Sequence, residues 1–428
     1  MHKRTDTTPA PVERAVLVGL VTRASRHTDP EQVLDELVGL ARAAGAVVVL
    51  TMVQDRAAAD PSTLIGRGKA EMLGRACAET GATLVIVDNA LSPAQARNLE
   101  EAVGRRVIDR TALILDIFAR RARTREGQLQ VELAQLEYRL PRLAGSSAAL
   151  SRLGAGIGTR GPGETKLETD RRRIRQRIAS LKASIAQVKR RRGYVRARRR
   201  RSDVPVVALV GYTNAGKTSL FNRLTGASET ASDALFVTLD PVLRRVKLGD
   251  RRQVLVSDTV GFIERLPHEL VAAFHATLEE VAGADLILHV IDGAAADAGR
   301  RADAVRVVLD EVGAADVPTI EVINKVDLVP AADRERLARA HPEAILASAR
   351  TGEGVDRLID VLVDRAGMDA ARVTLRLSAT SAADEQLVAE LYRVATVVRH
   401  EATDGRVSIQ ADIPRRWLRR FVRDRVPA

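Results

Sequence analysis

The stretch 206–219, VVALVGYTNAGKTS, joins an apolar run to a glycine-rich turn and then to the start of a helical pattern. The turn fits G-x-x-x-x-G-K-[S/T], with Gly211, Gly216, Lys217 and Thr218 at the fixed positions. A phosphate-binding loop requires this order of strand, turn and helix, because backbone N–H groups at a helix N-terminus then face the anion. The stretch therefore predicts a parallel α/β domain that binds a nucleotide.

Each side chain of this turn has an expected task. Lys217 should reach the β and γ phosphates, and the hydroxyl of Thr218 should bind Mg²⁺. The two glycines let backbone N–H groups turn towards the phosphates. The residues between them complete the expected nucleotide contacts: Tyr212, Thr213, Asn214 and Ala215. A chance match is a poor explanation, because a strand and a helix flank the turn on the required sides.

A second motif, DTVG at 258–261, ends the apolar run 253–257. Asp258 can hold Mg²⁺ through a water molecule, and the Gly261 N–H can meet the γ phosphate. The two residues between them are expected to line the same site: Thr259 and Val260. D-x-x-G is weak by itself, because many strand-ending turns contain aspartate and glycine.

Phe262 follows this motif, at a position where a glutamine often orients the attacking water. A phenyl ring can neither accept an ordinary hydrogen bond nor transfer a proton. Catalysis must then rely on electrostatic stabilisation of the phosphates and on another water-positioning group. We therefore expect slow intrinsic turnover that a partner accelerates.

A base-reading motif, NKVD at 324–327, follows the apolar run 318–323. The carboxylate of Asp327 can accept hydrogen bonds from the N1–H and the exocyclic amine of guanine, which adenine cannot supply. The other expected base contacts are Asn324, Lys325, Val326 and the SAR stretch of Ser348, Ala349 and Arg350, whose backbone can reach guanine O6. Four elements in this order, each after its own strand, predict a P-loop GTPase that converts GTP to GDP and phosphate.

Thr238 lies between the first two motifs, in a polar stretch that ends ALFVTLDP. Its hydroxyl can complete the Mg²⁺ shell while the γ phosphate is present and release it after hydrolysis. On spacing alone, an ordinary loop threonine is the alternative interpretation.

Strand and helix patterns also alternate before this domain. After an expected flexible tail at 1–13, apolar runs at 15–21, 46–53 and 84–87 alternate with helical patterns near 31–44, 69–80 and 93–103, which predicts an N-terminal parallel α/β domain at 14–126. We assign 202–367 to the GTPase domain and 368–428 to a small α+β domain. The latter contains an expected strand at 372–377, helix at 383–398 and strand at 406–413.

Between the two α/β domains, residues 127–201 carry two heptad stripes. One runs from Leu129 to Leu143 and the other from Leu167 to Val188. Six glycines occupy the gap at 144–163. We predict two antiparallel helices that bury each other's stripe and are joined by a long loop, which is a candidate contact element.

The charge of the chain is concentrated in one segment. Residues 171–201 contain 15 Lys and Arg and no acid, so the rest of the chain sums to −3 although the total is +12. A solvated helix face normally mixes signs, and this segment favours nucleic acid as its partner, with anionic lipid next. A simple solvated face in an arginine-rich proteome is the alternative.

The cysteine count and the length of the apolar runs limit the cellular compartment in which we expect the protein. Cys77 is the only cysteine, which excludes an intrachain disulfide and fits the reducing cytoplasm. No run approaches the length needed to span a bilayer, so we expect no transmembrane segment and at most peripheral membrane contact. We also expect a monomer.

Two further glycine patterns invite other interpretations. GIGTRG at 156–161 matches the dinucleotide fingerprint G-x-G-x-x-G, but no strand precedes it. Its glycines and the neighbouring basic residues suit a loop that moulds to a polyanion. GRGK at 66–69 raises the same possibility more weakly, and we favour the start of a helix there.

The most specific block of the chain is SRLGAGIGTRGPGETKLETDRRRIRQRI at 151–178, together with GYTNAGKTSLFN and DTVGFIERLP. On these residues the chain resembles the HflX family of ribosome-associated GTPases, and the resemblance covers nearly its whole length. The resemblance implies the same domain order. It also implies a factor that binds the large (50S) ribosomal subunit and, with GTP, splits or rescues stalled ribosomes under stress. The Gly145–Gly163 loop and the Arg171–Arg201 arm would then touch 23S ribosomal RNA.

The same resemblance adds residue roles. It marks Phe236, Val237, Thr238, Leu239 and Asp240 as the first switch, with Thr238 as a Mg²⁺ ligand. Asn214 would ligate a monovalent cation, K⁺, near the phosphates as a substitute for the missing glutamine. The candidate catalytic residues are then Lys217, Asn214, Thr238 and Gly261. KTS at 217–219 departs from the commoner KST, but threonine still offers a hydroxyl. An ATP site in the N-terminal domain has no motif here.

Rival interpretations remain open on the sequence. One is a GTP-regulated RNA-remodelling or ribosome-assembly factor. Another is a protein-binding switch whose hairpin is only a coiled coil.

Overall fold

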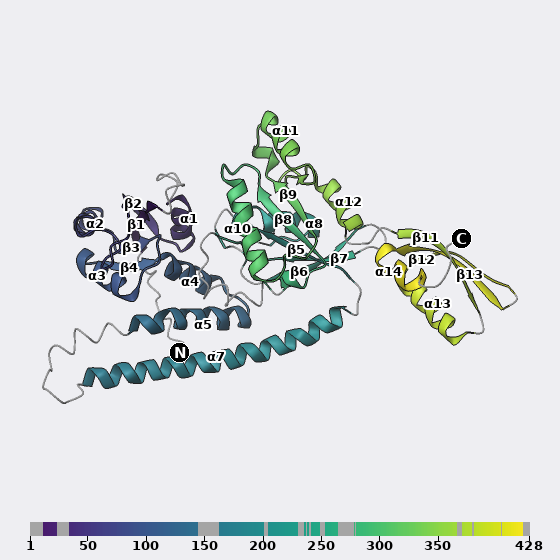
Figure 1. Ribbon diagram of the computed structural model, residues 1–428, viewed down its shortest axis with the longest axis horizontal. Coiled ribbons are helices and arrows are strands. Elements are labelled where there is room, and N and C mark those ends of the chain that lie inside the picture. The colour runs from purple at the N-terminus through teal and green to yellow at the C-terminus, as the bar shows by residue number, and fades with distance from the viewer. Residues whose placement is uncertain are drawn as a thin grey trace, which may run out of the picture.

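The computed structural model describes residues 12–23, 34–143, 162–200, 204–229, 235, 236, 238, 241–248, 253–263, 278, 280–365, 370–378, 381–403 and 405–422. Almost all of the expected tail and of the glycine-rich loop lies outside the described residues, as do Val237, Leu239 and Asp240. The predictions made for them stay predictions. The described chain forms a multidomain α/β protein (Figure 1).

The N-terminal sheet is parallel, with the strand order β2-β1-β3-β4. Its strands are β1 (Arg14–Val21), β2 (Val47–Asp55), β3 (Leu84–Val87) and β4 (Arg106–Asp109). Alternate residues of β1 point to opposite faces, so Leu17 packs with one buried cluster and Val18 with another. One cluster is covered by α1 (Asp35–Ala43) and α4 (Arg110–Arg121), the other by α2 (Arg67–Thr80) and α3 (Pro93–Val103).

Local signals place these helices. Ser92 and Gln95 form a reciprocal capping box at the start of α3, with Pro93 at its first position. Asp109 accepts a hydrogen bond from Ala112 N and so begins α4. The GRGK stretch is a helix start, as predicted, because Gly66 precedes the first residue of α2. The three predicted strands are confirmed, whereas β4 and α4 were not predicted.

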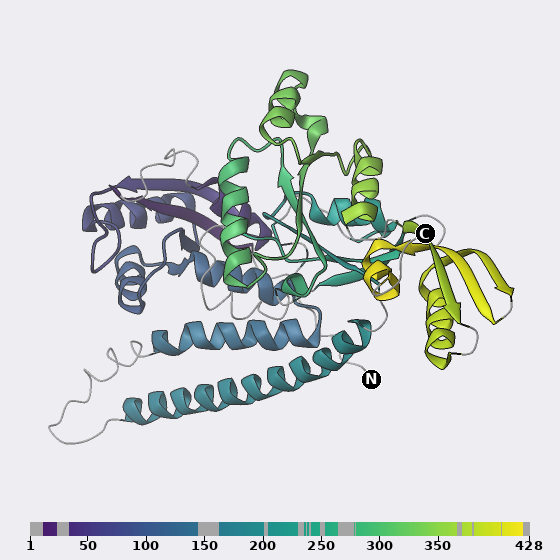
Figure 2. The same ribbon diagram turned by 45° about the vertical axis from the view of Figure 1, so that its right-hand side comes forward.

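The hairpin prediction is confirmed for the described residues. α5 (Arg125–Arg142) and α7 (Pro162–Arg200) lie side by side and antiparallel (Figures 1 and 2). Leu129 and Leu181 are buried between them. Arg177 forms a bidentate pair with Glu132 at 2.7 and 2.8 Å, and Lys182 Nζ lies 2.8 Å from Glu137. Acids of α5 thus neutralise two cations of the arm, a compensation that the charge count of 171–201 did not include.

The GTPase sheet has the order β10-β9-β8-β5-β7-β6, and all neighbours are parallel except β6 and β7. Its strands are β5 (Val206–Gly211), β6 (Val242–Lys247), β7 (Gln253–Asp258), β8 (Leu286–Asp292), β9 (Thr319–Asn324) and β10 (Ile345–Leu346). The associated helices are α8 (Lys217–Thr225), α10 (Ala298–Glu311), α11 (Ala331–Ala340) and α12 (Val355–Arg365). The five predicted strands are confirmed. The edge strand β6 was missed, because its sequence, VLRRVK, is polar and mostly exposed.

The C-terminal domain is an antiparallel sheet of order β11-β13-β12 with two helices. Its elements are β11 (Ala370–Ser378), α13 (Ala382–Val394), β12 (Thr396–Thr403), β13 (Arg406–Pro414) and α14 (Arg415–Val422). The predicted helix at 383–398 was too long: α13 ends at Val394, and the β-branched residues that follow begin the edge strand β12. α14 was not predicted.

No helix in the described ranges is both long enough and apolar enough to cross a membrane.

Candidate nucleotide site

The phosphate loop lies between the carboxyl end of β5 and the first residue of α8. Glycine is required at both of the glycine positions of the motif. A Cβ on Gly211 would lie 2.2 Å from the carbonyl oxygen of Val290, and one on Gly216, whose φ is +88°, would lie 2.2 Å from Asn324 Nδ2. The loop therefore packs tightly against β8 and the NKVD motif, and its N–H groups remain at the helix N-terminus where an anion is favoured.

Lys217 is buried, and its Nζ donates a hydrogen bond to the carbonyl oxygen of Tyr212 at 2.8 Å. Burial lowers the pKa of Lys217 to about 8, and the negative charge of Asp258 opposes this shift. A Cβ on Gly261 would lie 3.1 Å from the same Nζ. The structure thus brings the lysine and the DTVG glycine together, as the predicted phosphate contacts require.

Three oxygen-bearing side chains from separate elements converge beside the lysine. Asp258 Oδ2 accepts hydrogen bonds from the hydroxyls of Thr218 and Thr238, each at 2.9 Å, and the two hydroxyls are 3.0 Å apart. The other carboxylate oxygen, Oδ1, is buried and has no hydrogen-bond partner among the described residues. Burial raises the pKa of Asp258, while Lys217 and the two hydroxyls lower it. Two hydroxyls and a carboxylate are the hard donors that Mg²⁺ prefers, so this set fits that ion.

The base-reading motifs are tied to the phosphate loop by Asn324. Its Nδ2 donates to the carbonyl oxygen of Ala215 at 2.9 Å, and its Oδ1 accepts from Ala349 N at 3.0 Å. Asp327 accepts a hydrogen bond from Ser348 Oγ at 2.7 Å. One buried amide therefore fixes the NKVD turn, the SAR turn and the phosphate loop relative to one another.

Phe262 packs its side chain into the hydrophobic core. The ring is buried in a hydrophobic cluster shared by the N-terminal and GTPase domains. Its backbone is paired with the loop, because Thr213 N donates to Phe262 O at 2.7 Å and Phe262 N donates to Gly211 O at 3.1 Å. The residue after DTVG therefore supports the loop and cannot orient water.

The remaining predicted residues occupy distinct positions. Asn214 is exposed at the tip of the loop, with a φ of +60°. Lys325 lies on the base side, and its Nζ contacts Asp292 Oδ2 at 2.7 Å.

Sequence reasoning missed the contacts that Tyr212 makes outside the motif. The Tyr212 hydroxyl donates to the carboxylate of Glu36 in α1, and the guanidinium of Arg301 lies 5.1 Å above its ring. Neither partner belongs to a recognisable motif, so the sequence carried no signal for them.

Comparisons with known proteins agree with this geometry. Models described as GTP-binding GTPase N-terminal, GTP-binding GTPase Middle Region and 50S ribosome-binding GTPase match residues 31–119, 121–199 and 206–325. The chain is 44% identical over 407 residues to GTPase HflX of Escherichia coli, covering 94% of both chains. It is 48% identical over 350 residues to GTPase HflX of Caldanaerobacter subterraneus subsp. tengcongensis, covering 82% of this chain and 80% of the relative. The chain belongs to the HflX GTPase family.

This HflX-family chain is therefore a GTP hydrolase that binds GTP and GDP. Among solved structures it is similar to a GTP-binding protein from Sulfolobus solfataricus in complex with GDP, with 23% identity and a TM-score of 0.45. That similarity covers 83% of this chain and 99% of the other.

The lowered pKa of Lys217 predicts a pH dependence of nucleotide binding. Phosphates favour the charged ammonium, so binding above about pH 8 requires uptake of a proton that the free protein has lost. We expect the GDP dissociation constant to be constant below that pH and to rise by up to about tenfold per pH unit above it. Fluorescent-nucleotide titrations would measure the constant, and calorimetry in two buffers would count the protons. The absence of proton uptake above pH 8 would contradict the assignment.

Proposed function

We propose that the residues gathered at the phosphate loop divide the work of GTP hydrolysis. The observation that carries this proposal is the convergence of Thr218, Thr238 and Asp258 oxygens beside the buried ammonium of Lys217. Lys217 and the loop N–H groups hold the β and γ phosphates, and the N–H of Gly261 meets the γ phosphate. Asp327 reads the guanine edge, and the SAR backbone completes the base contact.

Thr218 and Thr238 would bind Mg²⁺ directly, and Asp258 would hold it through water. When bound, the ion would neutralise negative charge on the β and γ phosphates. The chain's own contribution is to keep these oxygens within 3.0 Å of one another on three separate elements. Thr238 is the only one of the three on the switch segment, so its hydroxyl reports whether a γ phosphate is present.

Turnover by this site is slow, because the position that commonly orients water carries the buried ring of Phe262. We propose that Asn214, exposed at the tip of the phosphate loop, ligates K⁺ next to the phosphates. A cation there would stabilise charge that develops on the transferred phosphoryl group. A partner would accelerate the reaction further.

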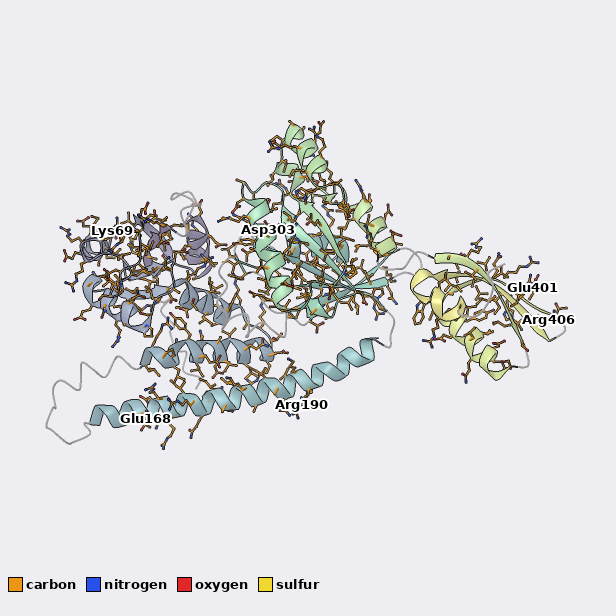
Figure 3. The ribbon with its side chains drawn as sticks, in the orientation of Figure 1. Lys69, Glu168, Arg190, Asp303, Glu401 and Arg406 are labelled. Atoms are coloured by element: carbon orange, nitrogen blue, oxygen red, sulfur yellow. The ribbon has the colours of Figure 1, made fainter. Side chains whose placement is uncertain are left out.

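We propose that this partner is the large ribosomal subunit, contacted through the loop at 145–163 and the arm at 171–201. The described part of the arm supports this. Acids of α5 pair with Arg177 and Lys182, whereas Arg190 and Arg191 are exposed and form no ion pair within the described ranges. Figure 3 shows Arg190 towards the end of α7 that leads to the GTPase domain, with Glu168 near the opposite end. Two adjacent exposed arginines on a long helix suit contact with a phosphate backbone. We further propose that GTP-dependent binding serves to split or rescue stalled ribosomes under stress, in the cytoplasm.

The guanine assignment predicts a change of base specificity. In Asp327→Asn, the side-chain amide can donate to the C2 carbonyl of xanthine but leaves the amine of guanine without its carboxylate. GTP affinity should fall on the order of 100-fold or more, with a gain for xanthosine triphosphate. Asp333→Asn, an exposed acid on α11, is the matched control. Competition titrations with both nucleotides measure the ratio, and an unchanged ratio in Asp327→Asn refutes the assignment.

The cation assignment predicts that K⁺, and not Na⁺, accelerates hydrolysis. Single-turnover GTP hydrolysis in matched KCl and NaCl would measure the effect. The acceleration should disappear in Asn214→Ala while GDP binding persists, because the exposed Asn214 does not anchor the loop. Equal K⁺ acceleration in both proteins would assign the ion to another site, and no K⁺ acceleration in the unmodified protein would refute the cation role.

The ribosome assignment predicts salt-sensitive co-sedimentation with purified 50S subunits that is stronger with a non-hydrolysable GTP analogue than with GDP. Arg190→Glu with Arg191→Glu should weaken binding on the order of tenfold and reduce its salt dependence. Arg357→Glu, an exposed cation on α12, is the charge control. Deleting 145–162 should abolish subunit binding and spare nucleotide binding. If neither change affects sedimentation, the hairpin is not the contact.

A further inference from the structure

The switch segment is packed against the N-terminal domain. The ring of Phe236 meets the ring of Phe118 on α4 edge to face, with centroids 4.6 Å apart and planes at 79°. Both rings are almost fully buried, at 2% and 0% exposure. Leu235 also reaches α1, since a Cβ placed on Gly39 would lie 3.1 Å from its Cδ1. Figure 1 shows α1 and α4 on the side of the N-terminal domain that faces the GTPase domain.

The backbone of Phe236 is held in an unusual conformation. Its φ of +58° lies in the left-handed region, which bulky side chains avoid. A residue persists there only when its surroundings hold it. The aromatic contact with Phe118 is such a restraint, and it comes from another domain.

Thr238 follows two residues later and reaches the opposite side of the segment. Its hydroxyl contacts Asp258 and Thr218 at 2.9 and 3.0 Å. Two residues span at most about 7 Å, so the position of Phe236 limits where the Thr238 hydroxyl can lie. One short piece of chain is thus anchored to the N-terminal domain at one end and to the proposed Mg²⁺ site at the other.

A second set of contacts fixes the N-terminal domain and the phosphate loop relative to each other. The hydroxyl of Tyr212 bonds to Glu36, and Glu36 pairs with Arg110, whose other nitrogen lies 2.8 Å from Asp88 Oδ1. Arg110 and Asp88 are buried, and Asp88 follows the end of β3. The phosphate loop is therefore attached to the same domain that carries Phe118, which lets Phe118 act as a fixed support.

We propose that Phe118 is a positioning residue for GTP hydrolysis: through Phe236 it places the hydroxyl of Thr238 at the Mg²⁺ site. The inference rests on the role proposed above for Thr238. Because the Mg²⁺ contact proposed for Thr238 depends on the γ phosphate, Phe118 would contribute to binding of the triphosphate form and not of the diphosphate form. A residue of the N-terminal domain thereby sets the preference of the GTPase domain between its two nucleotides.

The test uses the full chain and compares Phe118→Ala with the unmodified protein. Dissociation constants are measured for GDP and for a non-hydrolysable GTP analogue across a Mg²⁺ titration. We expect affinity for the analogue to fall about tenfold, with a higher Mg²⁺ concentration at half-saturation, and GDP affinity to stay within about twofold. Phe118→Leu, which keeps an apolar contact but loses the edge-to-face ring pair, should show a smaller selective loss in the same direction, about threefold for the analogue. It also serves as the test variant if Phe118→Ala does not fold.

Two controls separate positioning from loss of stability. Leu99→Ala leaves a cavity in the cluster on the other face of the N-terminal sheet, away from Phe236, and should lower the melting temperature without changing the ratio of the two affinities.

Thr238→Ala tests the Mg²⁺ role by itself and should show the same selective loss. Combining it with Phe118→Ala should add little, because both changes remove one interaction. An equal loss for both nucleotides in the Phe118 variants, a changed ratio in Leu99→Ala or full additivity with Thr238→Ala would overturn the proposal. A normal ratio in Thr238→Ala alone would instead refute the proposed Mg²⁺ role.

Discussion

Three parts of the chain meet at the carboxylate of Asp258, and the rest of the site is arranged around it. A buried carboxylate is costly unless hydrogen bonds and opposite charge offset its lost hydration. Here Thr218 and Thr238 donate to one oxygen, and the ammonium of Lys217 supplies the charge. The second oxygen remains buried without a described partner. The carboxylate therefore fixes the start of α8 and the switch threonine in one place while retaining capacity for a ligand.

The N-terminal domain forms one wall of this arrangement. Residues of α1 and α4 share a single hydrophobic cluster with Tyr212, Phe236 and Phe262. Burial of the Phe262 ring in that cluster explains why a residue without catalytic chemistry follows DTVG: the position is used to join two domains. The same residue leaves the attacking water without its usual partner, so packing between the domains and the proposed slow turnover have a common cause.

The sequence made the nucleotide site predictable because each motif is local. The loop at 211–218, the DTVG turn and the NKVD turn each follow their own strand, and parallel strands bring those ends to one edge of the sheet. The interdomain contacts could not be predicted. Glu36 and Phe118 belong to no motif, and each meets a residue more than a hundred positions away. Only the three-dimensional structure shows that these pairs exist.

The fold itself shows a similar division. Continuous apolar runs predicted the central strands, including the four-residue β3, whereas the edge strands β4, β6 and β12 were missed. Each of these three carries charged side chains. Edge strands bury little, so their sequences lack the continuous hydrophobicity that marks a central parallel strand. The heptad stripes were sufficient to predict the hairpin, because a repeat of this period marks the face that a partner helix covers.

The charged arm is joined to the nucleotide site by a continuous set of contacts. Phe236 packs on α4, and Asp109 begins that helix. Asp109 also accepts hydrogen bonds from Tyr138 at 2.7 Å and from Arg142 at 3.2 Å, both on α5. α5 in turn holds α7 through Glu132 and Glu137. Because Asp109 links α4 to α5, a displacement of α4 at its contact with Phe236 would also move α5 and the rest of the hairpin. The positive charge of 171–201 thus lies on a helix that is connected through α5 to α4, the helix that supports the switch segment.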